Sequence, residues 1–427
     1  MVSSEAANWA KSCGFGAKKG EICLVPGAGD KLGCVLFGLG ESGTPFDSGR
    51  LARQLPGGDY RFEGSADDDH LRALGWMLGA YRFDLYKKQS PQKAKLILNK
   101  EVDREALTRE AEASYLARDL INTPANDMGP DELEKAARKL ARSHSAKISV
   151  IKGDDLLKKN FPMIHAVGRA SVDAPRLIDI KWGAAKAPKL TLVGKGVTFD
   201  TGGLNIKPGG SMALMKKDMG GAANVLALAQ MIMTAKLNVR LRVLIPAVEN
   251  SISGNAFRPG DVLSSRKGIS VEIGNTDAEG RLVLGDALAL GDEETPDLMV
   301  DMATLTGAAR VALGPDLPPF YSDDDALASE LAQASVDQFD PLWRMPLWSP
   351  YQSMLSSKIA DVNHITAGGF AGSITAALFL SRFVEKANSW VHLDVFGWVP
   401  NAKPWANVGG EAQGIRALFA VIKQRYD

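Results

Sequence analysis

The sequence is poor in the side chains that build histidine- and cysteine-based metal sites. Its 427 residues include only five histidines and three cysteines. The cysteines all lie in the first 34 residues and form no CxxC pair, so neither a disulfide framework nor a thiolate zinc site is indicated. No two histidines have the HExxH spacing of many zinc peptidases. The low cysteine content is typical of a reducing compartment.

An excess of charge and long apolar runs are also absent. Lysine and arginine together number 50, as do aspartate and glutamate, so bulk charge attracts the chain neither to nucleic acid nor to an anionic membrane. No apolar run approaches the ~18 residues of a membrane-spanning helix, and the first residues lack the apolar centre of a signal peptide. We therefore expect a cytoplasmic protein that acts on a small substrate and binds neither a membrane nor nucleic acid.

Two regions of different organisation follow one another along the chain. Residues 1–105 mix short apolar runs and turns with one helical stretch near residues 70–83, which is typical of a small α/β domain. Residues 106–427 alternate strand-like and helical patterns, which predicts a three-layer α/β/α domain with a mixed, largely parallel sheet. The strand-like runs are 176–182, 189–196, 239–248, 297–305 and 390–398. A helical run at 104–123 connects the two regions, and the later helical runs are 131–143, 220–235, 280–293 and 373–387.

Carboxylates stand where several of these runs end. Asp200 lies in VGKGVTFDTGG, Asp218 in MKKDMGG, and Asp277 and Glu279 in NTDAEGR. Ligands of open α/β sheets bind beyond the C-terminal ends of the strands, so we expect these segments to meet at one edge. Four carboxylates could hold two divalent cations about 3.5–4 Å apart, and two ions that share a water molecule make hydroxide available near neutral pH. The sequence therefore predicts a hydrolase with a dinuclear metal site.

The order and spacing of four segments resemble the leucyl (cytosol) aminopeptidase family of dinuclear metallopeptidases. The segments are VGKGVTFDTGG, MKKDMGGAA, SGNAFRPGDVL and NTDAEGRL. The resemblance extends from about Ala117 to HLDVFGW near the end of the sequence, whereas the front region has no segment that aligns and looks shorter than is usual in the family. It implies an enzyme that removes the N-terminal residue, preferably leucine or another apolar residue, from short peptides through a metal-bridging hydroxide.

The resemblance also implies a role for each matching residue. One metal ion would be bound by Lys195, Asp200, Asp218 and Glu279, and the other by Asp200, Asp277 and Glu279. Zn²⁺ and Mn²⁺ are the expected ions. A lysine ligand must be neutral, and nearby cations lower the pKa of its amine. Lys207 would stabilise the negative charge that develops on the substrate, and Arg281 would hold a bicarbonate that acts as general base.

Three more positions match residues that line the family's pocket for the first side chain of the substrate. They are Met215, Thr304 and Gly307, and we call them the side-chain subsite. Because methionine adapts its shape, this subsite should accept a range of apolar side chains. The resemblance further implies a homohexamer built from two trimers, with sites that admit only short peptides.

Other interpretations stay open at this point. A single carboxylate at the end of a strand is more often a helix cap or a solvated turn residue than a ligand. A non-catalytic binding protein is disfavoured because every matched charged position is kept, and hydrolysis of dipeptides such as cysteinylglycine remains an alternative substrate choice. We expect structural roles for Asp301, Asp394 and the buried His392.

Overall fold

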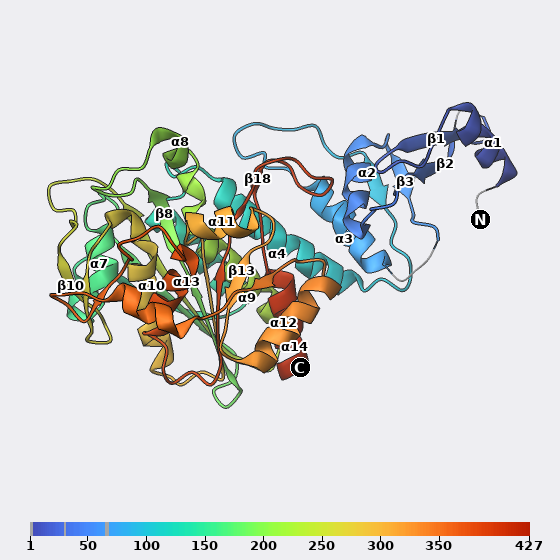
Figure 1. Cartoon of the computed structure of the whole chain (residues 1–427). Helices are drawn as coiled ribbons and strands as arrows, with labels where there is room; N and C mark the ends of the chain where they lie inside the picture. Colours follow the sequence, from blue (N-terminus) through green and yellow to red (C-terminus); the bar gives the residue numbers. More distant parts are fainter. Residues whose placement is uncertain (1–2, 30, 65–67) are drawn as a thin grey trace. The chain divides into compact units, whose positions relative to one another are not determined.

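The computed structural model describes residues 3–29, 31–64 and 68–427, and it divides into two compact units. The first unit extends to Ala111 and also includes Asn401–Val408, and the second comprises Glu112–Pro400 and Gly409–Asp427. Figure 1 labels the elements of both units. The late segment joins the first unit because the Arg53 guanidinium donates a 2.7 Å hydrogen bond to the carbonyl of Lys403, a contact that no local sequence pattern indicates.

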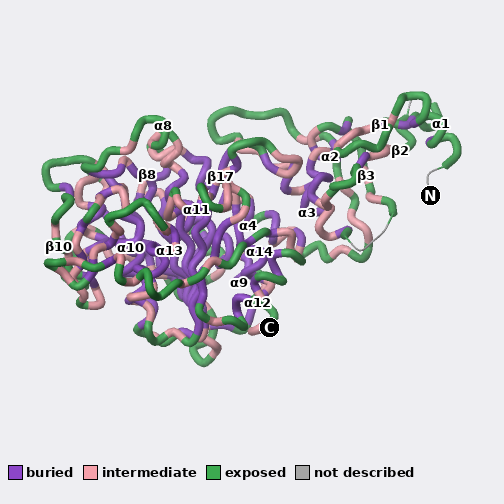
Figure 2. Tube along the Cα trace, viewed as in Figure 1, coloured by how far each residue is buried: buried purple, intermediate pink, exposed green. Residues whose placement is uncertain are grey.

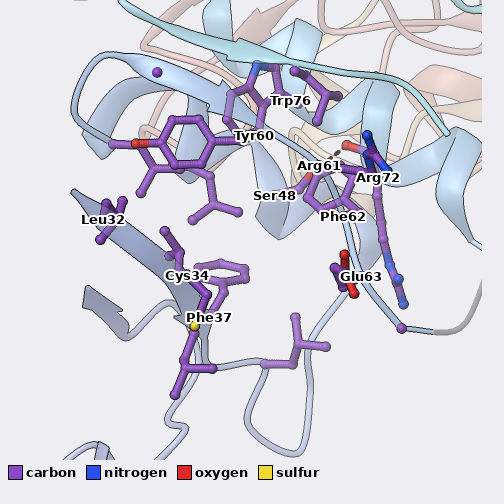
Figure 3. Close-up of a pocket in the computed structure, with 18 of the residues that line it drawn as sticks. Leu32, Cys34, Phe37, Ser48, Tyr60, Arg61, Phe62, Glu63, Arg72 and Trp76 are labelled. Carbon is purple, nitrogen blue, oxygen red and sulfur yellow. Dashed lines mark hydrogen bonds between the residues drawn. The ribbon is translucent and has the colours of Figure 1, made fainter. Parts of the chain in front are cut away.

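The first unit is a small α/β unit with two separate two-stranded sheets. Strand β1 (Ile22–Pro26) pairs antiparallel with β2 (Leu32–Phe37), and β3 (Gly58–Tyr60) pairs parallel with β4 (Ala94–Leu96). Its helices are α1 (Ser4–Ser12), η1 (Pro45–Ser48), α2 (Gly49–Gln54) and α3 (Asp69–Ala80), followed by the start of α4 (Arg104–Asn122). A cavity of about 1460 Å³ lies between β2 and the β3 segment, and Figure 3 shows aromatic side chains such as Tyr60 and Trp76 in its lining.

The second unit is built on a nine-stranded sheet whose centre is parallel. The strand order is β14-β13-β16-β12-β7-β9-β6-β5, with β8 also paired to β9. The four central strands β16, β12, β7 and β9 run parallel to one another. Strand β13 pairs antiparallel with β16, β6 pairs antiparallel with β9, and β5 pairs antiparallel with β6. The bounds are β5 (Lys147–Lys152), β6 (Arg176–Trp182), β7 (Lys189–Gly194), β8 (Gly196–Asp200), β9 (Arg240–Asn250), β12 (Leu298–Ala303), β13 (Pro319–Tyr321), β14 (Trp343–Arg344) and β16 (Trp390–Asp394). The prediction of a mixed, largely parallel sheet is confirmed.

Helices cover both faces of this sheet, so the predicted three-layer arrangement is also confirmed. Side chains of β12 alternate between the two layers: Val300 and Met302 belong to one buried cluster, and Met299 and Ala303 to the other. Figure 2 shows the buried strands at the centre of this unit. The first cluster includes the later part of α4, α5 (Pro130–Ser143), α9 (Gly220–Ala235), α12 (Asp325–Asp337) and α14 (Ile415–Tyr426), and the second includes α6 (Asp155–Lys158), α7 (Pro162–Gly168), α10 (Gly280–Asp292) and α13 (Gly372–Ser381).

Short elements complete the unit around the ends of the strands. Strands β10 (Val262–Ser264), β11 (Ser270–Glu272) and β15 (Val362–Asn363) form a small sheet, and β17 (Trp398–Val399) pairs with β18 (Gly409–Gly410). The remaining helical turns are α8 (Gly209–Met212), η2 (Met215–Met219), η3 (Thr276–Ala278), α11 (Gly307–Leu313) and η4 (Ser349–Leu355). In the described part of the chain, no helix has both the length and the apolar character needed to cross a membrane.

One helix is shorter than its sequence pattern predicts. The helical pattern covers residues 373–387, but α13 ends at Ser381. The carboxylate of Asp292 accepts hydrogen bonds from the backbone N–H groups of residues 385–387 at 2.8–3.1 Å, which holds this segment in a turn. The spacing of apolar residues indicates which side chains are buried, but it does not indicate a hydrogen bond to a distant residue such as Asp292. The prediction of a helix was therefore wrong beyond Ser381.

Candidate metal centre

The charged residues meet at the C-terminal edge of the parallel strands. Lys195 directly follows β7, and Asp200 is the last residue of β8. Thr304 follows β12 in the same way, and Asp394 ends β16. Because neighbouring parallel strands end at one edge of a sheet, these residues from distant parts of the sequence lie together. The site therefore occupies the position that open α/β sheets use for ligands.

Three carboxylates form the core of the candidate metal centre. Asp200, Asp277 and Glu279 each bring one oxygen to within 4.8 Å of the others. Asp277 lies on η3, whose first N–H groups are capped by the Asn275 side chain, with a 2.8 Å bond from the Asp277 N–H. Glu279 comes directly before α10 and is 1% exposed. Carboxylate oxygens this close repel one another strongly unless a cation lies between them.

Lys195 and Asp218 lie on one side of this core. The Nζ atom of Lys195 lies 2.7 Å from Asp218 Oδ2 and 3.0 Å from Glu279 Oε1, and it donates to the carbonyl of Thr304 at 2.9 Å. Burial disfavours the charge on Lys195, but the surrounding carboxylates outweigh burial and hold its pKa above the ordinary value. The four residues that the resemblance assigns to one metal ion are therefore neighbours in the structure.

Lys207 lies on the other side, against the carboxylates that the resemblance assigns to the second ion. Its Nζ is 2.9 Å from Asp200 Oδ2 and 2.5 Å from Asp277 Oδ1. Burial opposes its charge, yet the Asp200 carboxylate and the bonds to both aspartates raise the pKa of Lys207, so the side chain stays a cation at neutral pH.

A network that was not singled out from the sequence holds Asp200 in place. The side-chain amide of Asn250 donates to Asp200 Oδ1 at 2.8 Å and to the carbonyl of Thr276 at 3.1 Å. Gly202 N–H donates to the same Asp200 oxygen at 2.8 Å. Asn250 is fully buried and is the last residue of β9, so its place at the end of a strand-like run was a signal that could have identified it.

The donor set fits divalent cations. Both carboxylate oxygens of Glu279 are buried and accept no hydrogen bond from the described residues, although Oε1 is paired with Lys195. Burial, and next the charge of Asp200, raise the pKa of Glu279 to about 8. Two lysines face these four acids, and buried charge without compensation is costly. Carboxylate-rich sites with a few nitrogen donors suit Zn²⁺ and Mn²⁺.

Arg281 lies at the start of α10, where the backbone favours anions. Its Nη1 donates a 2.6 Å hydrogen bond to the carbonyl of His364, while its buried Nε has no hydrogen-bond partner among the described residues. Burial lowers the pKa of Arg281 to about 10, so it remains positively charged. His364 in turn lies 2.9 Å from the carbonyl of Asn275, which ties the arginine to the turn that carries Asp277. The free Nε and the helix N-terminus suit a small oxyanion.

Of the three residues expected to form the side-chain subsite, Thr304 contacts Asp218 directly. Thr304 Oγ1 donates to the carbonyl and to Oδ1 of Asp218, both at 2.9 Å. Met215 begins η2, three residues before Asp218, and Gly307 begins α11 with open space where a side chain would be. Between Met215 and Asp218 lies Lys217, and burial lowers the pKa of its amine to about 8.

The residues expected to be structural form buried networks beside the site. Asp301 Oδ1 lies 2.6 Å from His392 Nδ1, and its other oxygen accepts from Trp390 Nε1 at 2.8 Å. Asp394 accepts from the backbone of Leu305 and from the Thr306 hydroxyl, at 3.1 and 2.6 Å. These bonds tie β12 to β16 and order the loop that carries Thr304. These contacts support structural roles for Asp301 and Asp394, whereas the buried Nε2 of His392 has no hydrogen-bond partner among the described residues.

Comparisons with known proteins identify family domains in both parts of the chain. Residues 115–419 match the "Cytosol aminopeptidase family, catalytic domain", and residues 2–99, where the sequence offered no alignable segment, match the "M17 aminopeptidase, N-terminal domain". A probable cytosol aminopeptidase of Chlorobium phaeobacteroides is 36% identical, with 96% of this chain and 90% of the relative covered. One from Roseiflexus castenholzii is 40% identical, with 82% and 75% covered.

Solved structures give the same result. The crystal structure of the cytosol aminopeptidase from Coxiella burnetii has a TM-score of 0.96 and 48% sequence identity, with 100% of this chain and 94% of that chain covered. The bottromycin maturation enzyme BotP in complex with Mn has a TM-score of 0.91 and 33% identity, with 100% and 97% covered. This chain belongs to the cytosol aminopeptidase family and is a metal-dependent aminopeptidase, a hydrolase of peptides.

Proposed function

We propose that this enzyme removes leucine and other apolar N-terminal residues from short peptides by means of two divalent ions, Zn²⁺ or Mn²⁺. The observation that carries the proposal is the buried cluster of Asp200, Asp277 and Glu279, with both Glu279 oxygens lacking hydrogen bonds. Lys195 and Asp218 would complete one metal site, and the other three residues would form the second. The manganese complex of the relative BotP supports the choice of ion.

Lys195, Asp200, Asp218, Asp277 and Glu279 would hold the two ions, which would supply Lewis acidity for the attacking water and the first carbonyl. The residues around them do the remaining work. Lys207, a cation held by Asp200 and Asp277, donates a hydrogen bond to the carbonyl oxygen as negative charge develops there. Arg281 would hold a bicarbonate at the N-terminus of α10, and this anion would supply a general base.

The requirement for a free N-terminus follows from this arrangement. Only a peptide whose first amine can act as a ligand is placed with its first carbonyl beside Lys207. An acylated peptide of the same sequence should therefore resist cleavage. Met215 and Thr304 would contact the first side chain of the substrate. Because methionine adapts its shape, this subsite should accept several apolar side chains, such as leucine and methionine, and not a single one.

The experiment that tests the proposal is hydrolysis of leucine p-nitroanilide by chelator-treated protein that is then supplied with Zn²⁺ or Mn²⁺. Turnover should depend on the added ion and should be lost in the Asp277→Ala variant, which removes a carboxylate from the second site. Absence of turnover with every ion, in protein that binds two ions per chain, would favour a different substrate such as a dipeptide, or a non-catalytic role.

We also propose a cytoplasmic homohexamer of two trimers. The names of the relatives and the scarcity of cysteine support the location. The assembly rests on the family resemblance, and sedimentation velocity tests it directly: a mass near six times that of the 45.7 kDa chain is expected. A monomer would contradict the assembly without affecting the proposed chemistry.

A further inference from the structure

Lys217 is a buried cation whose side chain has no polar partner. It lies on η2 between Met215 and Asp218, and only 6% of the residue is exposed. Within the described ranges its Nζ takes part in no hydrogen bond or ion pair, and its recorded contact is the ring of Phe396, with the ring centroid 4.7 Å from Nζ. The neighbouring Asp218 carboxylate is engaged by Lys195 and Thr304. The Nζ atom itself keeps some exposure to solvent, so its unused N–H groups can meet an external acceptor.

Arg310 presents a second donor at the same aromatic ring. Its Cζ lies 5.7 Å from the centroid of Phe396, and its Nη2 donates to the carbonyl of Asp394 at 2.7 Å and also pairs with that carboxylate. Its Nη1 is buried and has no hydrogen-bond partner among the described residues. One side of the guanidinium is thus fixed by Asp394, and the other side keeps an unused N–H group.

Both donors lie on the segments that carry the side-chain subsite. Lys217 shares η2 with Met215, and Arg310 shares α11 with Gly307. A Cβ atom on Gly220 would lie 2.9 Å from Thr304 Cγ2 and 3.6 Å from the Cα atom of Gly397, the residue after Phe396. The segment that carries Phe396 therefore lies close to Thr304 of the subsite. An apolar ring and two donors with spare hydrogen-bonding capacity therefore lie on the segments that carry the subsite.

We propose that Lys217 and Arg310 make this subsite accept N-terminal glutamate and aspartate in addition to apolar residues, an inference that rests on the proposed aminopeptidase function. The methylene groups of glutamate would lie along the Phe396 ring. The carboxylate would accept hydrogen bonds from Lys217 Nζ and from Arg310 Nη1, and such charge-assisted bonds are about twice as strong as neutral ones. Leucine would use the same ring and leave the donors unused.

The test compares glutamate and glutamine p-nitroanilides on the metal-loaded wild-type enzyme, with leucine p-nitroanilide as reference. The two side chains have nearly the same shape, so their difference reports charge. We expect kcat/KM to be about tenfold higher for glutamate than for glutamine, and the Lys217→Gln and Arg310→Gln variants to lose most of this ratio. A variant that is merely damaged would lose activity on both substrates and keep the ratio.

Each outcome has a definite meaning. Equal or lower activity on glutamate than on glutamine, with leucine cleaved normally, would overturn this inference and leave the proposed function intact. No cleavage of any of the three substrates would contradict the proposed function itself. The C-terminal carboxylate of a short peptide is another group that the two donors could bind, and comparison of Leu-Gly with its C-terminal amide tests this alternative. Faster cleavage of Leu-Gly than of its amide, without a difference between glutamate and glutamine, would also overturn the inference. If the variants do not fold, the wild-type comparison alone decides.

Discussion

The ammonium of Lys207 lies 2.5 Å from the carboxylate of Asp277, in the turn between β11 and α10. The same Nζ is 2.9 Å from Asp200, so one lysine bridges two of the three clustered acids. Its side chain is only 13% exposed, and the surrounding charges keep it protonated. In the proposed mechanism this cation would donate to the oxyanion, and metal binding at Asp200 and Asp277 would release it from these two carboxylates.

Replacement of Lys207 by alanine should therefore slow the chemical step. We expect kcat for leucine p-nitroanilide to fall by about 10²–10³-fold, the usual cost of removing one oxyanion donor, while two metal ions stay bound. Steady-state kinetics with metal analysis of the purified variant measures both. Lys186→Ala, at an exposed position of the same unit, is the matched control. A rise in KM with unchanged kcat would show that Lys207 only helps binding.

Removal of the Asn250 side chain should weaken metal binding more than it weakens the fold. Asn250 fixes Asp200 by a 2.8 Å bond and links it to the Thr276 carbonyl. Loss of such an orienting partner usually costs about 10–100-fold in metal affinity. Competition with a chelator of known affinity measures the change in Asn250→Ala, with the exposed Asn401→Ala as control. Equal affinities in the two variants would show that Asp200 needs no such support.

The buried His364 should make the protein less stable in mild acid. Burial, and next the nearby Arg281, lower the pKa of His364 to about 3, whereas an unfolded histidine takes up its proton near 6.5. Between these values the unfolded chain binds more protons than the folded one, so stability is complete above pH 6.5 and decreases as the pH falls. From pH 7.5 to 5.0 this effect amounts to about 2 kcal/mol.

His364→Gln should remove that part of the pH dependence, since glutamine can still donate to the Asn275 carbonyl and does not titrate. Scanning calorimetry of both proteins at pH 7.5 and 5.0 gives the comparison. The thermal midpoint of the wild type should fall more than that of the variant. Equal decreases would mean that the folded protein protonates His364 readily.

A single methyl group on Gly221 should disturb the packing that places the site. The Cβ of an alanine there would lie 2.1 Å from the Met302 carbonyl oxygen, because α9 packs directly on β12. We expect Gly221→Ala to cost about 1–3 kcal/mol, as overpacking of a core usually does. Gly209→Ala is the control, since no atom lies within 4 Å of its Cβ position. Thermal midpoints of the two variants measure the difference, and equal midpoints would contradict the close contact.

Much of the fold could be predicted because its signals are local. The five strand-like apolar runs of the second region became β6, β7, β9, β12 and β16, since strands that are buried on both faces of a sheet are made of continuous apolar residues. The helix after residue 373 was predicted too long because Asp292, far away in the sequence, binds the backbone of residues 385–387. Residues 401–408 group with the first unit through a contact that the sequence pattern does not indicate, because their partner Arg53 is about 350 positions away.

The sequence by itself determined which residue types stand where strands end, and so the kind of chemistry that the edge of the sheet can support. Only the tertiary structure decided which of these groups meet: Lys195 with Asp218, Asn250 with Asp200, and Lys217 and Arg310 around Phe396. The physical reason is range. Periodic burial is set by neighbours a few residues apart, whereas the charge and hydrogen bonding of a site depend on side chains that the fold brings together from distant segments.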